Sequence, residues 1–121
     1  SYTTFQYGKP TASAKTINAD ESLTITIPVK NTGDMAGKET VQLYIGDDAA
    51  SVLRPVKELK GFNKVTLAPG AEETVTFTIR PEDLKFYDEA TSSWKAEPGK
   101  FRAYIGASST DIRATVPFEL K

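Results

Sequence analysis

The sequence LTITIPVK at positions 23–30 alternates apolar side chains with polar side chains or proline. A period of two places Leu23, Ile25, Ile27 and Val29 on one face of an extended chain. This pattern predicts a β-strand that buries one face and exposes the other. Because Pro28 has no N–H to donate, we expect its nitrogen at a sheet edge or a bulge.

The same alternation recurs along the chain. It is clear over residues 41–45, 75–79, 101–105 and 112–120, and weaker over 11–17, 59–67 and 84–87. Pro117 lies in the last clear segment, and we expect it too at an edge or a bulge. Turn-forming clusters such as Asn31-Thr32-Gly33-Asp34 and Ala68-Pro69-Gly70 separate these segments. About seven short strands predict an all-β, immunoglobulin-like antiparallel sandwich of two sheets, of the fibronectin type III-like kind that needs no disulfide.

Composition limits the chemistry that this chain can perform. It has 121 residues, no cysteine, no histidine and a net charge of -1, from 15 basic and 16 acidic side chains. We expect a single domain over residues 1–121. The composition excludes cysteine nucleophiles, histidine bases and the usual transition-metal ligands, so we expect no cofactor and no metal. The balanced charge and the lack of a long apolar run predict neither nucleic acid nor a membrane as partner.

Carboxylate pairs are the remaining route to catalysis, because two such groups can hydrolyse a glycosidic bond. The adjacent pairs are Asp47-Asp48, Glu72-Glu73, Glu82-Asp83 and Asp88-Glu89. Neighbouring side chains of an extended chain point to opposite faces, and each pair lies at a predicted turn. Ser108-Ser109 has no histidine to activate it. We therefore interpret these residues as turn and capping residues, and we expect no catalytic residue in this chain.

Exposed aromatic side chains are candidates for sugar contacts, because sugars pack their C–H faces on flat rings. The candidates are Trp94, Tyr87, Tyr44 and Tyr104, of which the last two occupy outward strand positions. The alternative is that these rings serve packing or a protein interface. A carbohydrate-binding module is therefore an alternative function.

An apolar stretch between predicted strands is the second lead. Residues 51–62 carry several aliphatic side chains where a lone domain would expose them to water, and Arg54 beside Pro55 has the character of an interface anchor. The candidate contacts with another surface are Val52, Leu53, Arg54, Pro55, Lys57, Leu59 and Phe62.

Several blocks, in order, carry a family resemblance. They are Val29-Lys30-Asn31-Thr32-Gly33, Val41-Gln42-Leu43-Tyr44-Ile45, Arg54-Pro55-Val56-Lys57-Glu58-Leu59-Lys60-Gly61-Phe62, Leu67-Ala68-Pro69-Gly70 and Tyr104-Ile105-Gly106-Ala107-Ser108-Ser109. Together they resemble the C-terminal fibronectin type III-like domain of glycoside hydrolase family 3.

The resemblance implies a non-catalytic domain that stabilises a β-glucosidase- or β-xylosidase-like parent enzyme and packs against its catalytic domains. The nucleophile and the acid/base of that family lie in other domains, and no position here matches either. Residues 1–10 resemble the segment leading in from a preceding catalytic domain, which adds Tyr2 and Phe5 to the interface candidates.

The expected partners are thus the catalytic domains of the same polypeptide, with an oligosaccharide as the alternative. A free-standing interaction domain is a third interpretation. The sequence does not fix the compartment, and a periplasmic or secreted parent enzyme is compatible with it.

Overall fold

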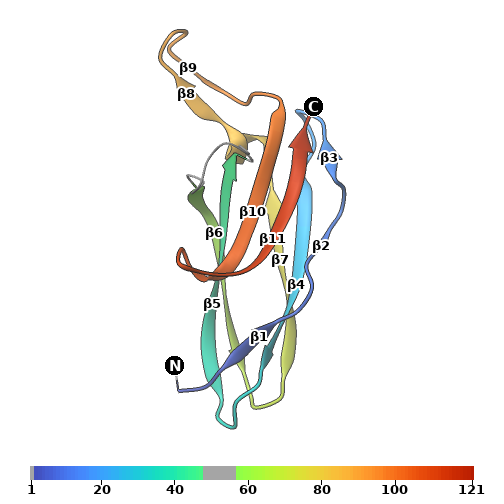
Figure 1. The fold of residues 1–121 in the computed structure, drawn as a ribbon, viewed down its shortest axis with the longest axis vertical. Helices are drawn as coiled ribbons and strands as arrows, with labels where there is room; N and C mark the ends of the chain where they lie inside the picture. The colour runs from blue at the N-terminus through green and yellow to red at the C-terminus, as the bar shows by residue number, and fades with distance from the viewer. Residues whose placement is uncertain (1, 48–56) are drawn as a thin grey trace.

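A computed structural model describes residues 2–47 and 57–121 as two β-sheets packed face to face, with a small hairpin projecting from one end (Figure 1). One sheet contains β1 (Phe5–Tyr7), β2 (Thr11–Ala12), β4 (Leu23–Asn31) and β7 (Glu72–Ile79). The other has the order β3 (Thr16–Ile17), β11 (Asp111–Leu120), β10 (Gly99–Ser108), β5 (Gly37–Asp47) and β6 (Lys57–Leu67). The predicted two-sheet sandwich is confirmed.

The described part of the chain has eleven strands rather than about seven. The predicted segment 11–17 divides into β2, which pairs with β4, and β3, which runs parallel to β11 in the other sheet. A 3-10 helix, η1 (Pro81–Leu84), leads into the hairpin of β8 (Phe86–Asp88) and β9 (Ser93–Lys95). The additional strands are thus short pieces at the chain start and in the hairpin.

The core lies between the inner faces of the two sheets, as the alternation predicts. Leu23, Ile25, Ile27 and Val29 of β4 have no exposed surface. They pack in one cluster with the inward side chains of the other sheet, which include Val41, Leu43, Ile45, Phe101, Ala103, Ile105, Val116, Phe118 and Leu120. Burial of these apolar side chains is the main term that holds the sheets together.

Pro28 lies on an inner strand and not at an outer edge of its sheet, but its nitrogen faces a break in the strand pairing. Because β7 pairs with β4 along one side, β1 and β2 share the other side, and Pro28 falls between them. The Gly8 N–H donates to the Pro28 carbonyl at 2.8 Å, so the Pro28 nitrogen faces this same interruption. A Cβ on Gly8 would lie 2.4 Å from the Pro28 ring, which explains the glycine there.

Pro117 lies at a sheet edge, as its missing N–H predicts. The Glu119 N–H donates to the carbonyl of Lys15, so the nitrogen two residues earlier faces the same side of β11. β3 pairs only with residues Glu119 and Leu120, and Pro117 therefore lies where that edge of β11 has no strand beside it. The missing N–H costs no ladder hydrogen bond at this position.

A fully buried amide, Asn31, ties three segments together at the end of β4. Its Nδ2 donates to the carbonyls of Met35 at 2.8 Å and Leu67 at 2.9 Å. Its Oδ1 accepts from the Thr3 hydroxyl at 2.7 Å and the Gly33 N–H at 3.0 Å. The side chain thus makes all four hydrogen bonds open to an amide.

Replacing Asn31 by alanine should lower the free energy of unfolding by roughly 2–4 kcal/mol, because buried carbonyls would lose their donors. Urea denaturation measures the change. Thr32→Ala is the matched control, since its hydroxyl bonds to Thr4 on the exposed surface, and it should cost less than about 1 kcal/mol. Equal midpoints for the two variants would contradict this role for Asn31.

Candidate interaction surface

Five sequence-predicted residues gather on the outer face of the five-stranded sheet. Tyr44 of β5 lies between Tyr104 of β10 and Leu59 of β6 on one cross-strand row. Lys57, opposite Gly46, and Phe62, opposite Gln42, occupy the rows on either side. We call these five residues, Tyr44, Lys57, Leu59, Phe62 and Tyr104, the aromatic sheet face. It joins two sets of candidates, for sugar and for domain contact, that the sequence alone kept apart.

A bulge explains why both Leu59 and Phe62 point outward. The β5–β6 register shifts between Leu43 and Tyr44, which leaves Lys60 as an extra residue on β6. Strict alternation would turn Leu59 to the same face as the buried Val65 and Leu67, and the bulge reverses it. Leu59 and Phe62 are consequently 52% and 60% exposed.

Lys57 lies over both tyrosine rings of this face. Its Nζ is 5.9 Å from the ring centre of Tyr44 and 5.8 Å from that of Tyr104, within the range of a cation–π contact. The Tyr44 hydroxyl donates to Oε1 of Gln42. Both rings are half-buried, and the ammonium group occupies ring surface that a stacked sugar would need.

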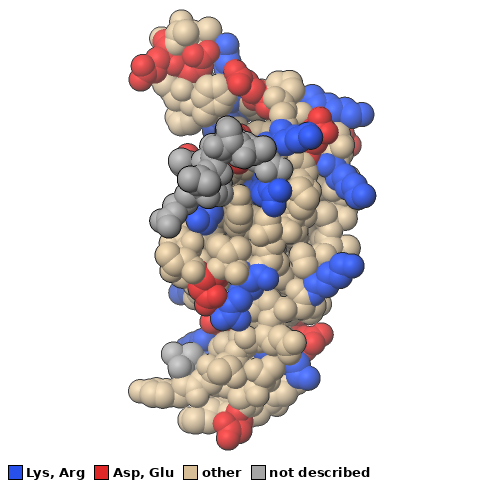
Figure 2. Space-filling view, viewed as in Figure 1, with Lys and Arg blue, Asp and Glu red and all other residues tan. Residues whose placement is uncertain are grey.

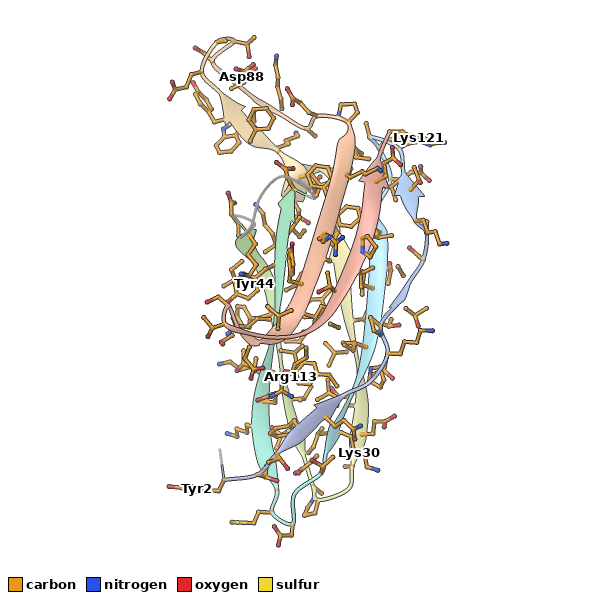
Figure 3. The ribbon with its side chains drawn as sticks, in the orientation of Figure 1. Tyr2, Lys30, Tyr44, Asp88, Arg113 and Lys121 are labelled. Carbon is orange, nitrogen blue, oxygen red and sulfur yellow. The ribbon has the colours of Figure 1, made fainter. Side chains whose placement is uncertain are left out.

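Trp94 and Tyr87 lie elsewhere, on the β8–β9 hairpin. Figure 3 shows Tyr44 on the body of the sandwich and Asp88 on the projecting hairpin. The two rings meet edge to face, with centres 5.6 Å apart and planes at 73°, and Trp94 is 66% exposed. The Lys95 ammonium lies 3.0 Å from Asp88, and the hydrogen bond between them holds the pKa of that carboxyl below its usual value.

The remaining candidates for contact with another domain differ in their exposure. Tyr2 is 96% exposed. Phe5 is only 9% exposed and belongs to the core of this chain, so the prediction that its ring contacts another domain is wrong. The physical reason is that β1 pairs with β4 and turns this ring between the two sheets. Val52, Leu53, Arg54 and Pro55 lie outside the described residues.

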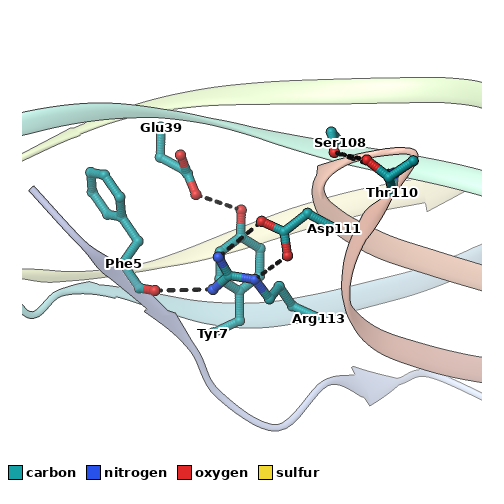
Figure 4. Close-up of polar contacts among 7 residues, drawn as sticks. All are labelled: Phe5, Tyr7, Glu39, Ser108, Thr110, Asp111 and Arg113. Atoms are coloured by element: carbon teal, nitrogen blue, oxygen red, sulfur yellow. Dashed lines mark hydrogen bonds and ion pairs between the residues drawn. The ribbon is translucent and has the colours of Figure 1, made fainter. Parts of the chain in front are cut away.

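A polar cluster that sequence reasoning missed anchors β1 to the opposite sheet (Figure 4). The Tyr7 hydroxyl donates to Glu39 of β5 at 3.0 Å. Arg113 of β11 donates to the Phe5 carbonyl at 3.1 Å, makes two hydrogen bonds to Asp111 and lies over the Tyr7 ring. No local motif could reveal this cluster, because its members lie up to 108 positions apart.

The cluster also shifts the pKa values of Tyr7, Asp111 and Arg113, of which that of Arg113 is raised by its hydrogen bond to Asp111. Burial, and then the hydrogen bond to Glu39, raise the pKa of the Tyr7 phenol well above its usual range. The hydrogen bond from Arg113 lowers the pKa of Asp111. Charge and burial thus favour a neutral Tyr7 and an ionised Asp111 in the folded chain.

Two of the acidic candidates serve turns, whereas Glu72 and Glu73 lie within β7 and not at the turn that the sequence predicted. Asp83 accepts the Arg80 N–H at 2.8 Å at the start of η1, and Asp88 accepts the Ala90 N–H and the Thr91 hydroxyl in the hairpin. The hydroxyls of Ser108 and Thr110 lie 3.3 Å apart in the β10–β11 turn. Asp48 lies outside the described residues.

Residues 2–47 and 57–121 contain neither a cluster of metal ligands nor a membrane-spanning helix. No group of three or more histidine, cysteine or acidic side chains is placed to hold a metal ion. No helix there has the length and apolar character needed to cross a membrane.

Known proteins similar to this chain agree on one family. The fibronectin type III-like domain family matches residues 39–109. A β-glucosidase of Bacteroides ovatus is 62% identical over 119 residues, which cover 98% of this chain and 16% of that protein.

Solved structures give the same result. A β-glucosidase from Erythrobacter marinus has a TM-score of 0.87 at 40% identity, covering 99% of this chain and 16% of its own. A GH3 β-glucosidase of Bifidobacterium adolescentis has a TM-score of 0.85 at 34% identity. The match covers 98% of this chain and 17% of that protein. This chain therefore spans about one sixth of the length of the relatives it matches.

The raised pKa of Tyr7 predicts a loss of stability at high pH. Below the unfolded-state pKa of about 10, the contribution of the neutral phenol is complete. As the pH rises further, the unfolded chain releases this proton and the folded chain keeps it, so unfolding is favoured. Tyr7→Phe should therefore lose stability less steeply than wild type between pH of about 10 and about 11.5 in urea titrations. Tyr2→Phe is the exposed control and should follow wild type; parallel curves for all three proteins would contradict the assignment.

Proposed function

The chain belongs to the fibronectin type III-like domain family, and we propose that it is a non-catalytic accessory domain of a family 3 glycoside hydrolase. The observation that carries the proposal is the match of nearly the whole chain to about one sixth of β-glucosidases. In this proposal the parent enzyme hydrolyses terminal β-glucosides or β-xylosides. This domain stabilises the parent by packing against the catalytic domains of the same polypeptide.

The carboxyl groups support a non-catalytic role. A general acid in glycoside hydrolysis needs a raised pKa. Among residues 2–47 and 57–121, Asp88 and Asp111 are the two carboxyl groups with resolved pKa shifts, and both pKa values are lowered by cationic neighbours. Both groups therefore stay ionised, as partners of Lys95 and Arg113, and neither is suited to donate a proton.

The start of the chain suits a fixed connection to a preceding catalytic domain, which is the role we propose for residues 1–10. Thr3 is bonded to Asn31, the Phe5 carbonyl to Arg113, and Tyr7 to Glu39. These contacts join β1 to both sheets, while the neighbouring Tyr2 stays exposed. A domain attached through this segment would have little freedom to rotate.

Oligosaccharide binding is the second candidate, and the hairpin favours it more than the tyrosine pair does. Trp94 offers a largely exposed ring, with the hydroxyls of Thr91 and Ser93 nearby on the same hairpin. The planes of Trp94 and Tyr87 cross at 73°, so the two rings form no continuous platform for consecutive sugar units. A single sugar unit on Trp94 is the form of binding that this geometry allows.

The accessory role predicts that the 121-residue chain alone does not hydrolyse nitrophenyl β-glucosides or β-xylosides. Deleting it from the parent enzyme should lower the thermal midpoint or the soluble yield, because the catalytic domains lose a packed surface. Differential scanning calorimetry and soluble expression measure both. A deletion that leaves melting and activity unchanged would rule the role out.

The sugar alternative predicts that the chain retains soluble or insoluble glucans or xylans. Titration and pull-down assays measure this binding, and Trp94→Ala should abolish it. Tyr44→Ala is the comparison variant, and because Lys57 covers that ring, it should have little effect. Absence of binding to every glucan and xylan would remove this candidate.

A further inference from the structure

Two apolar side chains on the aromatic sheet face present much of their surface to solvent. Leu59 and Phe62 lie on adjacent rows of β6 and are both more than half exposed. The half-buried rings of Tyr44 and Tyr104 continue the same surface across β5 and β10. Aromatic and aliphatic side chains grouped in this way form the centres of protein interfaces.

The charged residues on the outward positions of β5, β6 and β10 are positive, while Glu119 of β11, opposite Lys100, adds an acidic side chain to the same side of the sheet. Register places Lys57 opposite Gly46, Arg102 also opposite Gly46, and Lys64 opposite Thr40, all on outward positions. Glu58 pairs with the inward Ile45 and therefore lies on the other side of β6. Figure 2, seen from the side of β10 and β11, shows Lys and Arg side chains over the body of the sandwich with a few acidic side chains among them, and further acidic side chains at the hairpin end. Lys57 and Lys64 therefore favour a partner that places a carboxylate against this face.

Three other occupants fit less well. A second copy of this chain would place lysines against lysines across the interface, and like charges brought together are unfavourable. A sugar would have to displace Lys57 from the tyrosine rings. A nucleic acid needs a denser positive surface than a chain of net charge -1 offers.

Addition of a strand to the edge of β6 is also disfavoured. β6 is the last strand of its sheet, and it carries Lys57, Lys60 and Lys64 together with the bulge. Lysines and bulges on an edge strand are features that prevent pairing with another chain. The partner therefore docks on the face of the sheet rather than along its edge.

We propose that the aromatic sheet face is the docking surface for a catalytic domain of the same polypeptide, on a patch with apolar side chains beside one or more carboxylates. Leu59 and Phe62 fill the apolar part, and Lys57, held over the two tyrosines, meets a carboxylate. This inference rests on the proposed accessory function and assigns that function to one face of the domain.

The test mixes the purified 121-residue chain with the separately expressed catalytic region of its parent polypeptide and measures the dissociation constant by calorimetry. Phe62→Ser, Leu59→Ser and Lys57→Glu should each weaken binding at least tenfold, the effect expected of interface anchors. Trp94→Ser on the hairpin and Lys30→Glu on the opposite sheet are the controls and should stay within about twofold of wild type. Matching urea midpoints show that all variants fold.

The outcomes distinguish a failure of the proposed docking face from a failure of the proposed accessory function. If wild type binds and the sheet-face variants bind equally well, this face is wrong and the accessory function stands. If wild type does not bind the catalytic region, the accessory function fails and takes the inference with it. Two other results would overturn the choice of partner. They are binding of a single-stranded oligonucleotide, or self-association of the chain, that requires Phe62 and Lys57 and occurs in place of binding to the catalytic region.

Discussion

The buried side chain of Asn31 is the polar interaction on which the arrangement of this domain most depends. Apolar burial brings the sheets together, but it does not determine where the loops at one end lie. Asn31 does so by bonding Thr3, Gly33, Met35 and Leu67 at once, while its backbone bonds Gly70 and Ala71. A buried amide with every donor and acceptor matched admits few alternative arrangements of its neighbours. The position of the first strand, and of whatever joins it, follows from this constraint.

On the five-stranded sheet, the bulge in β6 determines which side chains face outward. The extra residue Lys60 turns Leu59 outward beside Phe62, and Lys57 is then placed over Tyr44 and Tyr104. One bulge thus converts a strand that would bury Leu59 into a strand that presents it. Bulges near functional surfaces are common, and this one places Leu59 on the surface that we propose as the docking face.

Hydrophobic alternation was sufficient to predict the core strands and the two-sheet class, because a period of two with one buried face has few other solutions. The edge position of Pro117 follows from its missing N–H, which is a local property that the sequence shows directly. Phe5 is an interface candidate only through the resemblance of residues 1–10 to an entry segment. Its pairing with β4 is non-local, so no local pattern signals that its ring is buried. The contacts of Tyr7 with Glu39 and of Arg113 with Phe5 join distant positions, so local patterns do not contain them. The grouping of Lys57, Leu59 and Phe62 with two tyrosines required the register and the bulge.

The central claim is that one face of this domain is covered in the parent enzyme and the hairpin is not. Hydroxyl-radical footprinting of the isolated chain and of the full parent enzyme tests it most directly, because it reports the exposure of individual side chains. The account predicts that oxidation of Leu59 and Phe62 falls severalfold in the parent, while oxidation of Trp94 is unchanged. Equal oxidation of Leu59 and Phe62 in both proteins would contradict it.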